Sequence, residues 1–389
     1  MFENIIGHRD VVSQLMRDIA SSSFPASSLI VGPAYSGKLT LALEIARVLS
    51  CQREGAWSCS CSSCNRQRFL MEPRTVVVGR KDFMREIRAA WDTLNRDCSL
   101  GPLYLFIRSV RKLLKRFEPF LWEDEESRIR DVSSAVASVS ESLEAFFPVS
   151  SSELPDVMSD KLQKAGNKIV KNCQTLSSSL PSDGVPASVI RRIVSLVHHS
   201  TASVPHVVII ENADYLNEAA RNALLKVLEE PPSSCYFILL SRKRSGIIPT
   251  ILSRVRPYVL FDRSEEDMTS VLRRVFKVDN GYSHLAEFFL SFMGIQEDGL
   301  VDKAKAFVAA VRGDASVDYS GIEVPKDDWS VWFELVLELL RKELSSLEPW
   351  RLDLLSQVMR DMNMSVSELN ISPVSAIEAA VLAFEGCRG

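Results

Sequence analysis

Four short apolar runs without alternation are spaced along the chain. They occupy residues 28–31, 75–78, 207–210 and 236–240. Continuous apolar runs of this length are typical of strands that are buried on both faces of a parallel sheet. Helical periodicity precedes the first run and continues from about residue 38 to 50 after it. The order helix, strand, loop, helix predicts a parallel α/β domain.

A long segment between the second and third runs, about 81–185, shows no strand pattern and predicts a helical insertion. From Leu103 to Phe117 apolar residues recur at i, i+3, i+4 and i+7. The rest of that helix carries Arg108, Arg111, Lys112, Lys115 and Arg116. We interpret these side chains as a solvated basic face over a helical core, in preference to a dedicated nucleic-acid surface.

Beyond residue 260 the periodicity is wholly helical. Residues 265–277 and 282–293 suit a small lid, and 329–345, 349–362 and 373–384 suit a C-terminal bundle. A chain of 389 residues exceeds the usual size of one hydrophobic core. We therefore predict three domains, 1–260, 261–320 and 321–389.

Composition excludes some classes of protein. The hydrophobic and charged fractions, 46% and 25%, are ordinary for a globular protein and argue against wholesale disorder. With 46 Lys and Arg against 50 Asp and Glu, the net charge of −4 gives no global basic field, so any DNA contact must be local or shared with partners. The N-terminal residues show no secretory pattern and no apolar run reaches membrane-spanning length, which predicts a cytoplasmic protein.

The segment Gly32 to Thr40, GPAYSGKLT, has the G-x4-G-K spacing of a P-loop, in which backbone N–H groups, a lysine and a hydroxyl hold phosphate and magnesium. Leu39 occupies the hydroxyl position. Thr40 cannot replace it simply, because one residue along a helix rotates a side chain by about 100°. Tyr35 adds bulk where the backbone must approach phosphate. The pattern predicts an eroded nucleotide site that keeps Gly37 and Lys38.

The third apolar run ends in Glu211 and Asn212, at the place of a Walker B motif. A hydrolytic site of this kind ends in an aspartate that supports magnesium, followed by a glutamate that polarises the attacking water. Asn212 cannot accept a proton, so the carboxylate that matters more for hydrolysis is missing.

Four cysteines cluster within fourteen positions as Cys51-x7-Cys59-x-Cys61-x2-Cys64. In a reducing compartment such a cluster indicates metal binding before disulfide formation. Four thiolates close a tetrahedral zinc site and leave no open position, so we predict a structural zinc module at 51–64 with all four ligands, in preference to free or three-ligand cysteines.

Two further strings identify a family. Residues 222–232 read NALLKVLEEPP, a helix ended by a Pro pair, and residues 248–255 read IPTILSRV. Together with the P-loop, the cysteine cluster, the Walker-B-like strand and the opening FENIIGH at 2–8, this order resembles the bacterial DNA polymerase III clamp-loader AAA+ family. The resemblance covers about 1–80 and 186–260, and the insertion departs from the family's compact pattern.

The resemblance implies a AAA+ domain followed by a helical lid and a helical collar. The family's ATPase subunits keep G-K-T and D-E, whereas its delta-prime type tolerates changes at both places, and this sequence is similar to the second. By the same resemblance Arg254, after Ser253, matches an arginine that reaches ATP held by a neighbouring subunit. Val255 replaces the family's cysteine, which should affect packing more than charge. The degenerate nucleotide site then comprises Gly32, Gly37, Lys38, Thr40 and Glu211, and whether it binds ATP stays open.

The resemblance also implies partners: the tau/gamma ATPase subunits, the delta subunit, and, through the assembled complex, the sliding clamp and primed DNA. The alternative is an active tau/gamma-like ATPase that uses Lys38 and Glu211, against which Leu39 and Asn212 speak. A zinc-dependent nucleic-acid binding module is a third hypothesis. The acidic net charge and the lack of interleaved basic and aromatic residues around 51–64 disfavour it.

Overall fold

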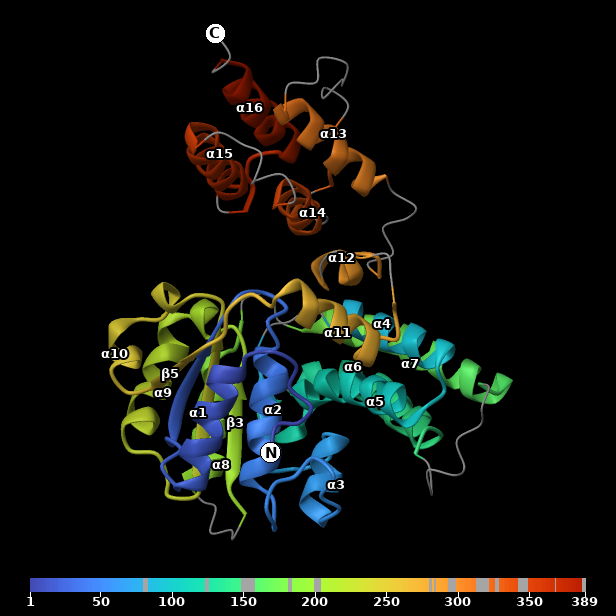
Figure 1. Cartoon of the computed structure of the whole chain (residues 1–389), viewed down its shortest axis with the longest axis vertical. Helices are drawn as coiled ribbons and strands as arrows, with labels where there is room; N and C mark the ends of the chain where they lie inside the picture. Colours follow the sequence, from blue (N-terminus) through green and yellow to red (C-terminus); the bar gives the residue numbers. More distant parts are fainter. Residues whose placement is uncertain are drawn as a thin grey trace. The chain divides into compact units, whose positions relative to one another are not determined.

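The computed structural model forms two compact units, Met1–Leu285 and Ala286–Gly389 (Figure 1). It describes residues 1–79, 83–122, 126–147, 158–180, 184–198, 204–279, 282, 285–292, 299–312, 322–325, 329–341, 349–367 and 369–386. None of the helices in these ranges is long and apolar enough to cross a membrane.

The first unit is built on a parallel sheet. Its strands are β1 (Ser27–Val31), β2 (Thr75–Val78), β3 (His206–Ile210), β4 (Cys235–Ser241) and β5 (Arg256–Val259). In the described residues their order is β2-β3-β4-β1-β5, and each neighbouring pair runs parallel. The four apolar runs are therefore strands, as predicted. This confirms the α/β class.

Strand β5 was not predicted. It lies at the sheet edge beside β1, and of its four residues only Tyr258 is buried, while Val259 is 39% exposed. An edge strand tolerates Pro257, which cannot donate a ladder hydrogen bond in a central strand. A short strand that contains proline and exposed residues lacks the continuous apolar run that predicted the other strands.

Helices cover both faces of the sheet. On one side α1 (Arg9–Ala20) and α2 (Lys38–Leu49) share a core with Ile30, Val77, Ile209 and Ile238. On the other, α8 (Ala187–His198) and α9 (Glu218–Glu229) pack against Leu29, Val76, Val208 and Phe237. Successive strand residues point to opposite faces, so apolar runs without alternation supply both cores. The loops that follow the strands meet at the carboxyl edge, where parallel α/β folds place their ligands.

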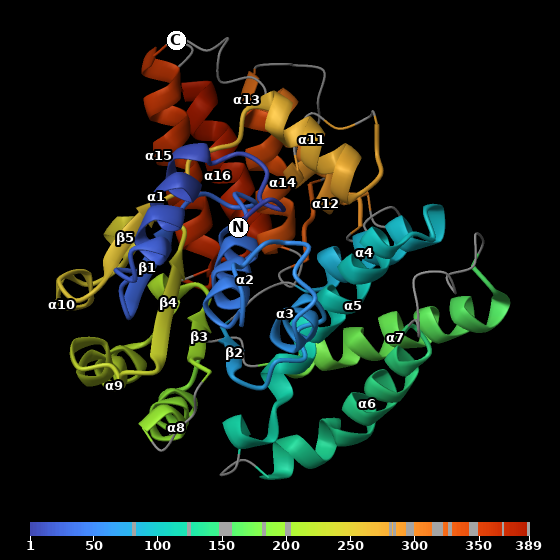
Figure 2. The same ribbon diagram turned by 60° about the horizontal axis from the view of Figure 1, so that its bottom comes forward.

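The insertion is helical, as predicted. It contains α4 (Met84–Arg96), α5 (Leu100–Leu114), η1 (Lys115–Phe117), η2 (Pro119–Trp122), α6 (Glu126–Glu144) and α7 (Asp160–Ser179). These helices bury a core of their own, which includes Ile87, Phe106, Val139 and Ile169. Figure 2 shows the helices beside the β2 edge of the sheet, and η1 contacts β2. The insertion is thus a helical part of the first unit with its own core, attached at the β2 edge of the sheet.

Short elements complete the first unit: α3 (Ser62–Arg68), η4 (Ala213–Tyr215), η5 (Arg244–Gly246), α10 (Pro249–Leu252) and α11 (Glu265–Val275). Helix α12 (Leu285–Leu290) begins where the units divide. In the second unit α13 (Leu300–Arg312), α14 (Trp329–Arg341), α15 (Pro349–Ser367) and α16 (Pro373–Gly386) pack around the fully buried Trp332. Helix α11, the first helix of the predicted lid, belongs to the first unit, and the three-domain division stays a prediction.

Candidate functional site

The P-loop joins β1 to α2, and its lysine forms hydrogen bonds within the loop itself. The Nζ atom of Lys38 donates to the carbonyl oxygens of Gly32 and Pro33, at 2.6 and 2.5 Å. Leu39 packs into the core with 8% of its surface exposed, whereas Thr40 is exposed. The residue at the hydroxyl position is therefore a core residue, and the neighbouring threonine points elsewhere, as the rotation along the helix predicts.

Two more cationic or ring nitrogens bind the carbonyls of this loop. Arg263 Nη1 donates to the carbonyl of Tyr35 at 2.6 Å, and His8 Nε2 lies 2.8 Å from the carbonyl of Ser36. Burial lowers the pKa of both side chains from its ordinary value. Gly37 has φ of 88°, a left-handed conformation that favours glycine, and a Cβ there would lie 2.6 Å from Arg263 Nη2.

Glu211 follows β3, and its side chain is buried and paired inside the protein. Its carboxylate forms an ion pair with Arg116 of η1, and the two side chains are 9% and 3% exposed. Its backbone N–H donates to Val78 of β2 at 2.8 Å. Asn212 is in the left-handed conformation with φ of 51°, which asparagine tolerates better than most residues.

Arg116 is held from several sides. Its guanidinium lies 4.9 Å from the ring centroid of Phe83, and its Nη1 donates to the carbonyl of Lys112 at 2.7 Å. Burial lowers the pKa of Arg116 from its ordinary value, and the carboxylate of Glu211 works against that shift. In a hydrolytic site the carboxylate at the position of Glu211 supports magnesium. Here a buried guanidinium lies beside that carboxylate instead.

Three further basic residues of α5 and η1 also have partners inside the protein. Arg108 donates to the carbonyls at the end of α3, Lys112 pairs with Glu86, and Lys115 donates to the carbonyl of Glu72 at 3.0 Å. The predicted solvated basic face is thus wrong for these residues, because each has an internal partner. From α4, Arg85 Nη1 donates to the Tyr35 hydroxyl at 3.1 Å. The insertion therefore contacts both the P-loop segment and Glu211.

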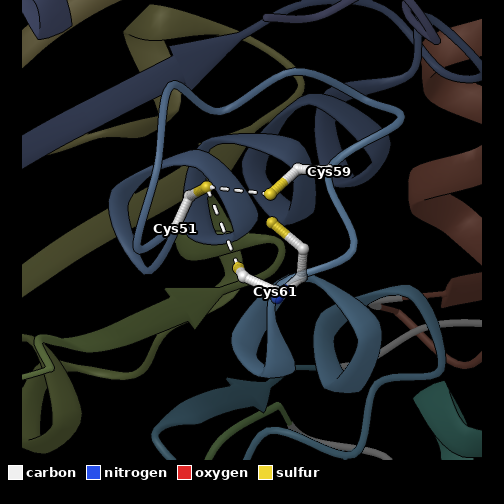
Figure 3. Close-up of side chains that lie close together, drawn as sticks. Cys51, Cys59 and Cys61 are labelled. Carbon is white, nitrogen blue, oxygen red and sulfur yellow. Dashed lines mark hydrogen bonds between the residues drawn. The ribbon is translucent and has the colours of Figure 1, made fainter.

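The four clustered cysteines converge although one spacing is short. Cys51 follows α2, Cys59 and Cys61 lie in the loop, and Cys64 is in α3; their sulfur atoms all lie within 4.8 Å of one another. Sγ of Cys51 is 3.7 Å from that of Cys59 and 4.0 Å from that of Cys61 (Figure 3). Four sulfurs at about 2.3 Å from a tetrahedral zinc would be separated by about 3.8 Å. The donor set and its spacing fit a metal ion.

Nearby groups favour the thiolate form of Cys61, whereas the pKa of Cys64 stays above its ordinary value. Burial raises the pKa of the Cys61 thiol, but hydrogen bonds from the N–H groups of Cys64 and Gln52 outweigh burial and lower the pKa to about 6. Burial raises the pKa of Cys64, and Arg47 opposes that by donating Nη1 to its Sγ at 3.2 Å. Arg47 is itself anchored on Glu44 by bonds of 2.9 and 2.6 Å.

Arg254 follows α10 and lies at the surface. Its Nε and Nη2 donate to one carboxylate oxygen of Glu229, at 3.1 and 2.8 Å, and Nη1 donates to the carbonyl of Thr250 at 2.8 Å. Glu229 belongs to the NALLKVLEEPP string, so the two family motifs meet in space. Val255 is buried in the core, as its predicted packing role requires.

The comparisons with known proteins agree with these motifs. Residues 150–263 match the family model described as DNA polymerase III, delta subunit. The delta' subunit of DNA polymerase III from Haemophilus influenzae is 32% identical over 119 residues, which are 29% of this chain and 36% of that protein. The delta' subunit from Escherichia coli is 37% identical over 79 residues, 20% and 24% of the two chains.

A gamma subunit of DNA polymerase III from Buchnera aphidicola is also similar, 36% identical over 89 residues that are 23% of this chain and 24% of that protein. The chain thus spans about a third of the first relative and about a quarter of the other two. This chain is similar over these segments to subunits of DNA polymerase III. Within that class it is similar to the delta-prime type, as its motifs predict.

Proposed function

We propose that this chain is a delta-prime-like subunit of a DNA polymerase III clamp loader. It supports ATP-dependent loading of the sliding clamp onto primed DNA in the cytoplasm, and it does not hydrolyse ATP itself. The observation that carries the proposal is the ion pair between Glu211 and Arg116. A carboxylate already neutralised by a buried guanidinium is a poor magnesium ligand, and Asn212 next to it cannot act as a base.

The partners follow from the same proposal. We propose that the tau/gamma ATPase subunits and a delta subunit bind this chain, that the helices of residues 261–320 form a lid and those of 321–389 a collar, and that Arg254 serves ATP on a neighbour. Reconstitution with the organism's other loader subunits and clamp tests this. Loading onto primed DNA should require the chain, and normal loading without it would contradict the proposal.

Negligible ATP hydrolysis by the purified chain is expected, because Leu39 and Asn212 remove the magnesium hydroxyl and the water-polarising carboxylate together. Nucleotide binding through Gly37 and Lys38 should be weak, since Lys38 would first have to leave two carbonyl oxygens. Steady-state ATPase assays of the wild type and Lys38→Ala should give the same background. Turnover at rates typical of AAA+ enzymes that disappears in Lys38→Ala would instead establish the tau/gamma-like alternative.

We propose that the cysteine cluster binds one structural Zn²⁺ per chain. Zinc suits four thiolates, and a closed site pins a loop that is too small to hold itself by burial. Elemental analysis of protein purified without chelator should give one zinc per chain. Cys64→Ser should lose most of it and lower the thermal midpoint of unfolding. Cys98→Ser, half-buried outside the cluster, is the matched control and should keep its zinc. A metal-free wild type that is folded and active in loading would defeat the assignment.

A further inference from the structure

Helix α7 of the insertion has one face fixed by packing. Its buried residues are Gly166, Ile169, Cys173 and Leu176. A Cβ at Gly166 would collide with the ring of Trp91, so α7 approaches α4 as closely as glycine allows. On a neighbouring side Asn172 donates to Ser138 of α6 at 3.1 Å. Figure 2 shows α7 running along the insertion beside α6.

The opposite face carries four lysines. They are Lys161, Lys164, Lys168 and Lys171, and all four are exposed. Their spacing of i, i+3, i+7 and i+10 places them in one stripe, because a helix turns about 100° per residue. At a rise of about 1.5 Å per residue the stripe is about 15 Å long.

This stripe has no internal neutralisation. Within the described ranges none of the four lysines forms an ion pair. Apart from the four lysines, the exposed residues of α7 are Asp160 and neutral polar side chains. Like charges at i+3 and i+4 destabilise a helix, and Lys161 also faces the positive end of the helix dipole. The folded chain maintains these repulsions on a protein whose net charge is −4.

We propose that the lysine stripe of α7 binds the phosphate backbone of DNA. This inference rests on the proposed function, because it assigns to this chain a direct contact with the DNA on which the loader acts. Along one strand of a duplex, about 15 Å corresponds to about four base-pair steps, so successive lysines can reach successive phosphates. Flexible ammonium groups suit phosphate contacts that read no sequence. The exposed residues of α7 include no apolar anchor of the kind that marks a protein-binding surface.

The test is a fluorescence anisotropy titration of the full chain with labelled primed DNA at several salt concentrations. The variant replaces Lys161, Lys164, Lys168 and Lys171 with glutamine. The control removes the same charge from exposed arginines elsewhere, by replacing Arg9, Arg17, Arg53 and Arg360 with glutamine. The lysine variant should bind at least about tenfold more weakly at low salt, and the slope of log K against log salt should fall by about 0.9 for each phosphate that the variant no longer neutralises. Its thermal midpoint should not fall, since like-charge repulsion is removed.

Equal DNA affinity and salt slope in the lysine variant, the control and the wild type would overturn the inference. So would binding of the stripe to a poly-glutamate peptide without binding to DNA, which would identify an acidic protein as the partner. Loading by the reconstituted complex separates the two proposals. In one outcome neither the wild-type chain nor the lysine variant binds DNA, while the complex loads clamps equally well with either. That outcome overturns the DNA contact and leaves the proposed function intact. A chain that binds DNA through α7 but is dispensable for loading contradicts the proposed function alone.

Discussion

Arg116→Met is expected to lower the free energy of unfolding by about 3–5 kcal/mol, because the carboxylate of Glu211 would stay buried without its cation. Both side chains are nearly inaccessible, so water cannot replace the missing partner. Urea denaturation at neutral pH measures the change. The matched control is Arg273→Met, which breaks the exposed ion pair with Asp279 and should cost at most about 1 kcal/mol.

The pH dependence of this loss distinguishes a broken ion pair from a packing defect. In Arg116→Met the charged form of the buried, unpaired Glu211 carboxylate would be destabilised, so as the pH falls the folded state should bind a proton there before the unfolded chain does. The defect should therefore shrink as the pH falls toward about 5. Glu211→Gln leaves a buried arginine that cannot lose its proton, and its defect should persist at that pH. Equal losses at both pH values in Arg116→Met would contradict the electrostatic explanation.

Releasing Glu211 should not create an ATPase. Arg116→Met frees one carboxylate, but Leu39 still occupies the hydroxyl position and Asn212 still follows the strand. The ion pair is thus better described as a structural contact in place of a metal site. It does not inhibit an otherwise active ATPase site. The insertion, which supplies Arg116 and Arg85, braces the loops that a nucleotide would otherwise order.

The fold could be predicted from sequence wherever burial on both faces left an unbroken apolar run. The central strands and the helix after the P-loop start within one or two residues of their predicted positions. Strand β5 was not predicted, because Pro257 and its position at the sheet edge leave it without an unbroken apolar run. Helix α13 was also not predicted. Its hydrophobic partners, such as Trp332, lie in other helices of the second unit.

The site was predictable only where its residues are neighbours in sequence. The P-loop and the cysteines lie within short segments, so their spacing carries their geometry. Arg116 and Glu211 are separated by 95 positions, so nothing in the sequence around either residue predicts that the two form an ion pair. Periodicity identified the apolar face of α5 correctly, but it assigned the charged residues to solvent by default. Charged side chains are seldom fully buried unless they are paired, and here the partners lie on distant elements.

Arg254→Ala in the assembled loader is expected to reduce ATP hydrolysis at the neighbouring site that it serves by about 10³-fold. The free chain already holds the guanidinium at the surface, where its pair with Glu229 is worth no more than about 1 kcal/mol, so the side chain can leave it for a phosphate at small cost. Clamp- and DNA-stimulated ATPase of reconstituted complexes measures the effect. The loss in the whole complex should be smaller, because the other ATPase sites still turn over.

Two variants separate the trans-acting role from a structural one. Arg254→Lys keeps the charge but loses the planar fork, and it should rescue poorly. Glu229→Gln breaks the same surface ion pair yet leaves the arginine in place, so its complex should hydrolyse ATP and load clamps close to the wild-type rate. All complexes should be checked by size exclusion and for zinc content. Normal ATPase and loading in a correctly assembled Arg254→Ala complex would reduce Arg254 to a surface residue and leave the chain as scaffold alone.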